Sequence, residues 1–361
     1  MAKFYYGGQA VMEGVMMRGR TSAAVAIRRP DQSIYLYEEA LNPRLYQNRL
    51  FRLPFLRGLL VLWEMLVLGT RLMTLSANIV SGAVNPDVHT TAPASDRARP
   101  GTNGHQPTGE EPASLPADMA PPQIGGVTLV VTLLISLGFA LLVFFLAPLF
   151  IANLFPGQVG AGWLNLVIEG VLRLLLLLGY LYLIGRIPDI QRVFGYHGAE
   201  HKAINAMEQS DPLDIPHVRR ASRVHTRCGT GFLLLVMVVS IFVFAFVVTP
   251  SLPLKVLSRI VLVPVVAGIS YELMRLGAAY YRFRIVRWLL APGLALQSLT
   301  TREPDDSMIE CAIASLKRVT QRDGLVVPGG EESVSNRKGA LLELTHELPP
   351  LPERQGSEAE V

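Results

Sequence analysis

The chain has 361 residues, of which 50% are apolar and only 17% are charged, and its net charge is +4. Soluble domains average about 25% charged residues, so this composition excludes one ordinary soluble globular domain. The basic residues stand beside apolar segments without an aromatic-rich basic module, which argues against a nucleic-acid partner and for an anionic lipid surface.

The first 50 residues combine a glycine-rich segment with two short β patterns. Four glycines within the first 20 residues permit tight turns and close backbone approach. Residues 21–29 and 33–40 hold the β-branched and aromatic residues typical of strands, and a Pro-Asp turn separates them. We therefore expect a small cytoplasmic β element within residues 1–50.

Residues 51–82 have a helical, apolar pattern that is interrupted by charges. Arg57, Glu64 and Arg71 recur every seven residues and therefore share one helical face. This stripe fits an interfacial or re-entrant amphipathic helix. It also fits a tilted span whose stripe packs inside a bundle. The even spread of the charges favours the first alternative.

Four long apolar segments predict membrane-spanning helices, because each approaches or exceeds the ~20 residues that cross a ~30 Å hydrocarbon core. They are residues 127–150, 163–185, 231–250 and 256–276. Backbone polar groups must be satisfied within lipid, so these segments are expected to be helical. The basic loop after the second span and the basic segment after the fourth are predicted to be cytoplasmic. An even number of spans then places both termini in the cytoplasm.

These elements predict a mainly α fold: a multi-pass membrane helix bundle with a small cytoplasmic β element. The membrane domain covers residues 124–290 and contains a cytoplasmic loop at 187–230. A cytoplasmic segment at 291–322 ends in an amphipathic helix, 306–322, with Asp305 or Asp306 as N-cap.

Two further segments have compositions typical of disorder. Residues 85–123 are rich in Pro, Ala, Thr, Asp and Gly, which predicts a disordered linker. Residues 325–361 are polar and acidic and predict a disordered tail.

The cytoplasmic loop contains the order His-x-x-Glu-His, which is the inverzincin signature. In a helix His197 and His201, at i and i+4, share one face and their imidazoles can hold one metal ion. Glu200 stands beside that face and could polarise a bound water as general base. Continuing the helix brings Glu208 to the same side.

A second group of candidate ligands precedes the third span. His225 and Cys228 offer nitrogen and sulfur donors to a divalent ion such as zinc. Glu272 lies about one turn inside the cytoplasmic end of the fourth span, where an ionisable side chain needs a partner. The topology therefore predicts that these groups meet the His-x-x-Glu-His segment at one cytoplasmic layer of the membrane.

Each of these features also has a structural alternative. The same polar residues could form a hydrogen-bonded cap that seals the bundle. Glu272 could pair with Arg275 or with the arginines of residues 51–82. Glu169 and Arg173, at i and i+4 in the second span, fit a structural ion pair better than a transport site, and Cys311 fits a packing residue.

At these motifs the chain resembles the YqhQ-type family of bacterial membrane proteins, the domain of unknown function 1385. The matching stretches run in order through most of residues 3–320: GQAVMEGVMMRG at 8–19, HGAEHKA at 197–203, HTRCGT at 225–230 and PGLALQSLTTREP at 292–304. The predicted linker and tail fall outside the resemblance.

The resemblance implies a multi-pass protein of the bacterial inner membrane, described as a predicted metal-dependent enzyme without a settled substrate. His197, Glu200, His201, His225 and Cys228 occupy motif positions of the family, so the suspected metal role carries over to them. The inverzincin fold does not, because two predicted spans separate Glu272 from the motif.

The leading hypothesis is a membrane-embedded, metal-dependent hydrolase whose site opens at the cytoplasmic face. Glu13 and Arg18 are expected to line the site, with Arg18 suited to an anionic group. Gln297 and Glu303 are expected to form another wall. The location alone suggests a lipid or lipid-linked substrate.

The main rival is a non-enzymatic adaptor or assembly factor in which the same residues dock a protein partner. A transporter is the third alternative, motivated by the charged residues within the predicted spans. Four spans without a repeat of broken helices count against it.

Overall fold

The computed structural model describes residues 6–41, 53–82, 126–154, 163–247, 251–325, 328 and 343–344. The linker predicted at 85–123 lies outside these residues. So does the tail predicted beyond residue 325, except for Pro328 and the pair Glu343–Leu344.

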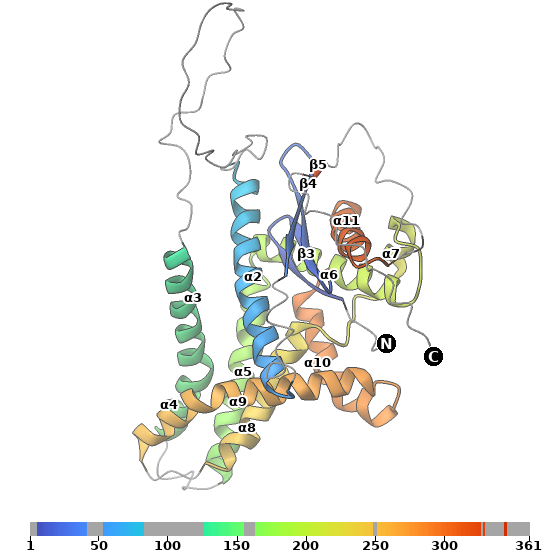
Figure 1. The fold of residues 1–361 in the computed structure, drawn as a ribbon. Coiled ribbons are helices and arrows are strands. Elements are labelled where there is room, and N and C mark those ends of the chain that lie inside the picture. Colours follow the sequence, from blue (N-terminus) through green and yellow to red (C-terminus); the bar gives the residue numbers. More distant parts are fainter. Residues whose placement is uncertain are drawn as a thin grey trace, which may run out of the picture.

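The described chain is mainly helical and contains one sheet, as predicted (Figure 1). Its helices are α2 (Leu56–Val80), α3 (Gly126–Leu141), the π-helix η3 (Leu142–Leu146), α4 (Ala147–Asn153), α5 (Trp163–Ile184), α6 (Pro188–Glu208), α7 (Ile215–Arg220), α8 (Gly229–Ala245), α9 (Leu252–Ala279), α10 (Arg284–Thr300) and α11 (Asp306–Arg322). Its strands are β1 (Gly7–Val11), β2 (Gly14–Arg18), β3 (Ser22–Arg28), β4 (Ile34–Ala40) and β5 (Glu343–Leu344).

The sheet is an antiparallel meander of β1 to β4 in sequence order, and the two-residue β5 pairs in parallel with β4. The register places Val25 between Met16 and Tyr37. The strands predicted at 21–29 and 33–40 are confirmed as β3 and β4. The glycine-rich first 20 residues, for which only turns were expected, supply β1 and β2 as well. The turn between them contains Glu13, which has a φ of 52°.

Both faces of the sheet are buried, because successive side chains of a strand point to opposite sides. On one face Val15, Met17, Ala24 and Ala26 join a core with α6 and α11. On the other face Val11, Met16, Val25 and Ile27 pack against Leu68, Leu72 and Ile79 of α2. The sheet is thus the middle layer between α2 on one side and α6 with α11 on the other (Figure 1).

Four described helices are long and apolar enough to cross a membrane, which indicates a multi-pass membrane protein. They comprise Leu56–Val80, Val130–Ala152, Val167–Ile184 and Pro253–Ala279. The span predicted at 231–250 corresponds to α8, which has only 17 residues and falls short of this length. The prediction ran past Ala245 because the following residues are also apolar.

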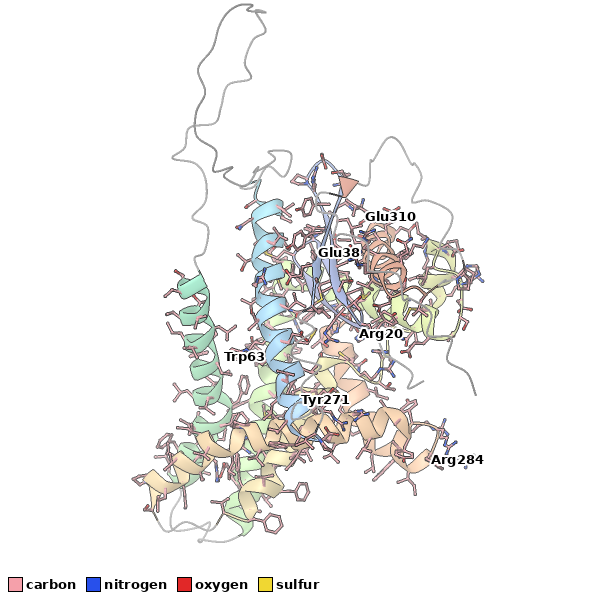
Figure 2. All side chains as sticks on the ribbon, viewed as in Figure 1. Arg20, Glu38, Trp63, Tyr271, Arg284 and Glu310 are labelled. Atoms are coloured by element: carbon pink, nitrogen blue, oxygen red, sulfur yellow. The ribbon has the colours of Figure 1, made fainter. Side chains whose placement is uncertain are left out.

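Helix α2 uses its predicted charged stripe to contact other elements. Arg57 pairs with Glu272 of α9, Glu64 with Arg18 of β2, and Arg71 with Glu39 of β4. Trp63, by contrast, is exposed on the side away from the sheet (Figure 2). The stripe therefore ties α2 to α9 and to the sheet, although Arg71 itself is exposed.

A buried ionic cluster joins α5, α8 and α9. Arg173 donates from Nη2 to Glu169 Oε1 at 2.6 Å, and Arg259 donates to the two oxygens of Glu169 at 3.2 and 3.0 Å. Arg173 also donates to Ser240 Oγ at 2.7 Å and to the carbonyl oxygen of Phe144 in η3 at 3.0 Å. The ion pair expected between Glu169 and Arg173 is present, and Arg259 is a member that the spacing did not reveal.

Cys311 lies on α11 in the core against the sheet and is completely buried, as expected for a packing residue. Burial raises the pKa of its thiol to about 12. At about pH 8.5, where an ordinary cysteine is half ionised, Cys311 is expected to resist iodoacetamide because the thiolate is the reactive form. Mass spectrometry of a Cys228→Ser variant, whose sole cysteine is Cys311, measures this directly. Rapid labelling of the folded variant would contradict the burial, and unfolding in detergent should restore ordinary labelling.

Candidate metal centre

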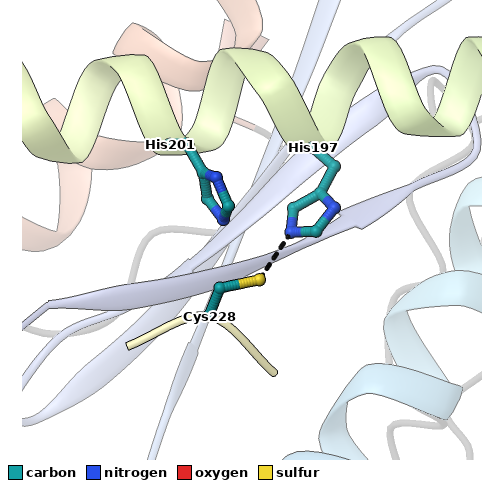
Figure 3. A group of neighbouring side chains, drawn as sticks. All are labelled: His197, His201 and Cys228. Atoms are coloured by element: carbon teal, nitrogen blue, oxygen red, sulfur yellow. Dashed lines mark hydrogen bonds between the residues drawn. The ribbon is translucent and has the colours of Figure 1, made fainter. Parts of the chain in front are cut away.

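The helix predicted for the His-x-x-Glu-His segment is α6, and it presents two histidines to the start of α8. His197 and His201 lie one turn apart on α6 and face Cys228 (Figure 3). Cys228 is the N-cap of α8, and its sulfur accepts a hydrogen bond from the Thr230 N–H at 3.4 Å. Two helices therefore position the three side chains.

The three side chains place their donor atoms close together. One ligand atom from each of His197, His201 and Cys228 lies within 4.8 Å of the other two. Cys228 Sγ is 3.3 Å from His197 Nε2, and the two imidazole centroids are 4.4 Å apart. Bond lengths of ~2.0–2.3 Å in a tetrahedral zinc site put ligand atoms about 3.3–3.8 Å apart. Small side-chain movements would bring all three donors to that spacing.

Backbone carbonyls orient both imidazoles. His197 Nδ1 lies 2.9 Å from the carbonyl oxygen of Thr300, and His201 Nδ1 lies 2.5 Å from that of Arg223. A carbonyl only accepts, so each Nδ1 donates its N–H and each ring turns its Nε2 toward Cys228 or the neighbouring donors. Metal-binding histidines are commonly fixed in this way.

His201 Nε2 has no hydrogen-bond partner within the described part of the chain, although the side chain is 0% exposed. An unsatisfied buried polar atom costs about 1–3 kcal/mol. A cation between Nε2 and the neighbouring donors would remove this cost. The donor set of two imidazoles and one thiol therefore fits a divalent ion such as zinc.

His225 stands next to this group without belonging to it. Its ring centroid is 5.5 Å from that of His201. Gln297 holds its backbone with two hydrogen bonds, accepting from the His225 N–H at 3.0 Å and donating to the His225 oxygen at 2.7 Å. Burial lowers the pKa of His225, and nearby His197 lowers it further, while Glu200 opposes the shift. His225 thus borders the three donors while its Nε2 lies nearest Arg227, at 3.4 Å.

Two carboxylates of α6 flank the histidines. Glu200 is buried, and a Cβ placed on Gly8 would lie 3.0 Å from its Cγ, so β1 packs directly against it. Glu208 accepts a hydrogen bond from Arg227, and its Oε1 is 4.0 Å from His225 Nε2. Glu208 therefore lies on the histidine side of α6, as its helical spacing predicted.

Gly198 allows the close approach that brings Thr300 to His197. A Cβ at Gly198 would lie only 2.1 Å from the carbonyl oxygen of Arg302. Arg302 in turn donates its N–H to the carbonyl oxygen of Phe194 at 2.8 Å. The backbone that follows α10 therefore packs directly on the backbone of α6.

Glu303 and Gln297, predicted to line one wall of the site, make structural contacts beside the histidines. Glu303 accepts from Lys202 Nζ at 2.8 Å and from Arg223 Nε at 3.1 Å. It thereby holds the residue whose carbonyl orients His201. Gln297 is buried behind the His225 backbone.

The two predicted site residues from the β element are engaged elsewhere. Glu13 accepts from Arg192 at 2.5 Å and from the Tyr196 hydroxyl at 3.2 Å, and the hydrogen bonds from Arg192 hold the pKa of Glu13 below its usual range. Arg18 pairs with Glu64 at 2.8 Å. Glu13 thus contacts α6 at Arg192 and at Tyr196, the residue directly before His197, while Arg18 faces α2.

Glu272 does not join the histidines in the described contacts, which corrects the predicted convergence. It accepts from Arg57 Nε at 2.8 Å and from the Phe55 N–H at 3.1 Å, and Arg275 lies 3.9 Å away. The prediction assumed a fourth span parallel to the others. Helix α9 instead runs crosswise to α2 and α5, so Glu272 meets the start of α2 (Figure 1).

Sequence reasoning missed the groups that orient the imidazoles and the guanidinium beside them. The carbonyls of Thr300 and Arg223 have no side-chain signal, since every residue has a carbonyl. Arg227, next to Cys228, lies 3.4 Å from His225 Nε2 and was visible only as one of several basic loop residues.

Comparison with known proteins finds the same family that the sequence motifs resemble. Residues 53–322 match the family described as "Protein of unknown function (DUF1385)". The "Uncharacterized protein YqhQ" of Bacillus subtilis (strain 168) is 36% identical over 322 residues, which cover 89% of this chain and 93% of that protein. No solved structure matches the chain. The matched family region and the extent of this identity show that the chain belongs to the DUF1385 family.

Proposed function

We propose that the chain is a metal-dependent enzyme of the bacterial cell membrane, with its centre at His197, His201 and Cys228. The observation that carries this proposal is the buried Nε2 of His201, which has no partner among the described residues and lies beside two further donors. Three protein ligands with one open position are the arrangement of catalytic rather than structural zinc. His225 is the nearest further donor, at the edge of the group.

The proposed reaction is a hydrolysis. A bound divalent ion supplies Lewis-acid polarisation and a water of lowered pKa. Glu200 would act as general base and take a proton from the attacking water. The water oxygen would then bond to the electrophilic carbon or phosphorus of the substrate, the bond to the leaving group would break, and the proton would pass to that leaving group. Glu200 is buried, interacts electrostatically with His225 and is not one of the three ligands, which supports this role.

The place of the centre in the fold supports a substrate that reaches the membrane surface. Cys228 begins the apolar helix α8 and Thr300 ends α10, while α6 belongs to the sheet-bearing part. The centre thus lies where the apolar helices meet the sheet-bearing part, and a lipid or lipid-linked substrate is the class we propose. In this arrangement the sheet and the centre face the cytoplasm.

Glu200→Gln is expected to retain the metal and lose turnover by about 100-fold or more, because it removes the base without removing a ligand. The measurement compares membrane extracts of cells that express wild type or the variant, using untargeted mass spectrometry for accumulating substrate. Asp189→Asn is the matched control, since Asp189 is exposed on the same helix. Identical extracts from wild type and Glu200→Gln would favour the adaptor alternative, in which a protein partner docks on this surface.

A further inference from the structure

The connection between α9 and α10 carries three arginines among exposed apolar side chains. Arg282, Arg284 and Arg287 are all exposed. Ile285, between Arg284 and Arg287, is 74% exposed, and Trp288, directly after Arg287, is 76% exposed. Figure 2 shows Arg284 at the outer end of this hairpin. We call residues 280–289 the hairpin surface.

The charge of the hairpin surface is not compensated nearby. No Asp or Glu occurs in the sequence between Glu272 and Glu303. Within the described residues, no ion pair joins Arg282, Arg284 or Arg287 to a carboxylate. The Arg282 guanidinium instead lies 4.8 Å from the ring centroid of Phe283. Three cations thus face outward together.

Such a surface matches the boundary between lipid headgroups and acyl chains. Tryptophan is enriched at that depth, and arginines on an amphipathic segment meet anionic headgroups. The hairpin surface also continues directly from Pro253–Ala279, one of the helices able to cross a membrane. The bilayer beside that helix is therefore within reach of Trp288 and the three guanidiniums.

We propose that the hairpin surface binds the headgroups of anionic phospholipids, with Trp288 and Ile285 inserted among the acyl chains and Arg282, Arg284 and Arg287 on the phosphates. This inference is independent of the metal centre.

Fluorescence quenching of Trp288 tests the proposal. Trp63 and Trp163 are replaced by phenylalanine, so that Trp288 is the sole tryptophan. The full chain is reconstituted with brominated phosphatidylglycerol or brominated phosphatidylcholine at equal mole fraction. Phosphatidylglycerol is expected to quench Trp288 about twofold more strongly, because it is concentrated around the arginines. The combined Arg282→Gln, Arg284→Gln and Arg287→Gln variant is expected to lose this preference.

A matched control uses Trp63 as the sole tryptophan, since it is exposed on α2 without a neighbouring arginine cluster. Its quenching should be the same with both lipids. Equal quenching of Trp288 by the two lipids in the arginine-containing chain would overturn the proposal, whether or not the glutamine variant folds.

Discussion

Replacing both His197 and His201 by alanine is expected to remove a stoichiometric divalent ion from the purified protein while the fold persists. The two side chains supply two of the three donors, and backbone carbonyls hold the Nδ1 atom of each ring. Loss of an outer-shell partner alone costs 10–100-fold in metal affinity, so loss of two ligands should exceed about 100-fold. Elemental analysis of detergent-purified protein prepared without chelators should find about one ion per wild-type chain and none in the variant.

His217→Ala is the control for this experiment. His217 lies on α7, half exposed, and pairs with Asp214 of the same turn. The His217→Ala variant should therefore keep the ion. A folded wild-type chain that carries no ion under these conditions would defeat the metal hypothesis. If Cys228 of that metal-free protein were rapidly alkylated, the contact with His197 would instead indicate a thiol nucleophile.

Glu169→Gln is expected to destabilise the apolar helices by about 3–5 kcal/mol, the usual effect of breaking a buried charge pair. The change would leave Arg173 and Arg259 buried without a carboxylate, since both donate to Glu169. Unfolding in detergent measures the loss. Glu39→Gln is the comparison, because its pair with the exposed Arg71 lies at the surface, where such a pair contributes about 0–1 kcal/mol.

Replacing the whole buried ionic cluster by apolar residues distinguishes a structural role of the cluster from a role in transport. Glu169→Leu with Arg173→Met and Arg259→Met is expected to restore stability to wild-type level or above it, as for other buried ionic groups replaced by apolar ones. If this variant also retains the function of the chain, the cluster is a structural tie between helices. A Glu169→Gln variant within about 1 kcal/mol of wild type would show that water reaches the cluster.

Local sequence patterns were sufficient where one segment carries its own signal. The i, i+4 spacing of His197 and His201 predicted that both lie on one face of a helix, and α6 carries both of them one turn apart. Asp305 caps α11 by accepting the Met308 N–H at 2.9 Å, as the N-cap rule predicts. Strands β3 and β4 followed from β propensity around a turn. Strands β1 and β2 did not, because their glycines weaken the propensity and pairing with β3 decides their conformation.

The sequence by itself therefore determined which segments are apolar, which are helical and which residues carry donor atoms. Only the tertiary structure decided which of those residues meet. Periodicity gives the length of a helix and its faces but not its direction, so the crosswise course of α9 took Glu272 to Arg57 and left three donors together at the start of α8. The orientation of those imidazoles depends on carbonyls 22 and 103 residues away in the chain, and contacts of that range arise only when the helices pack.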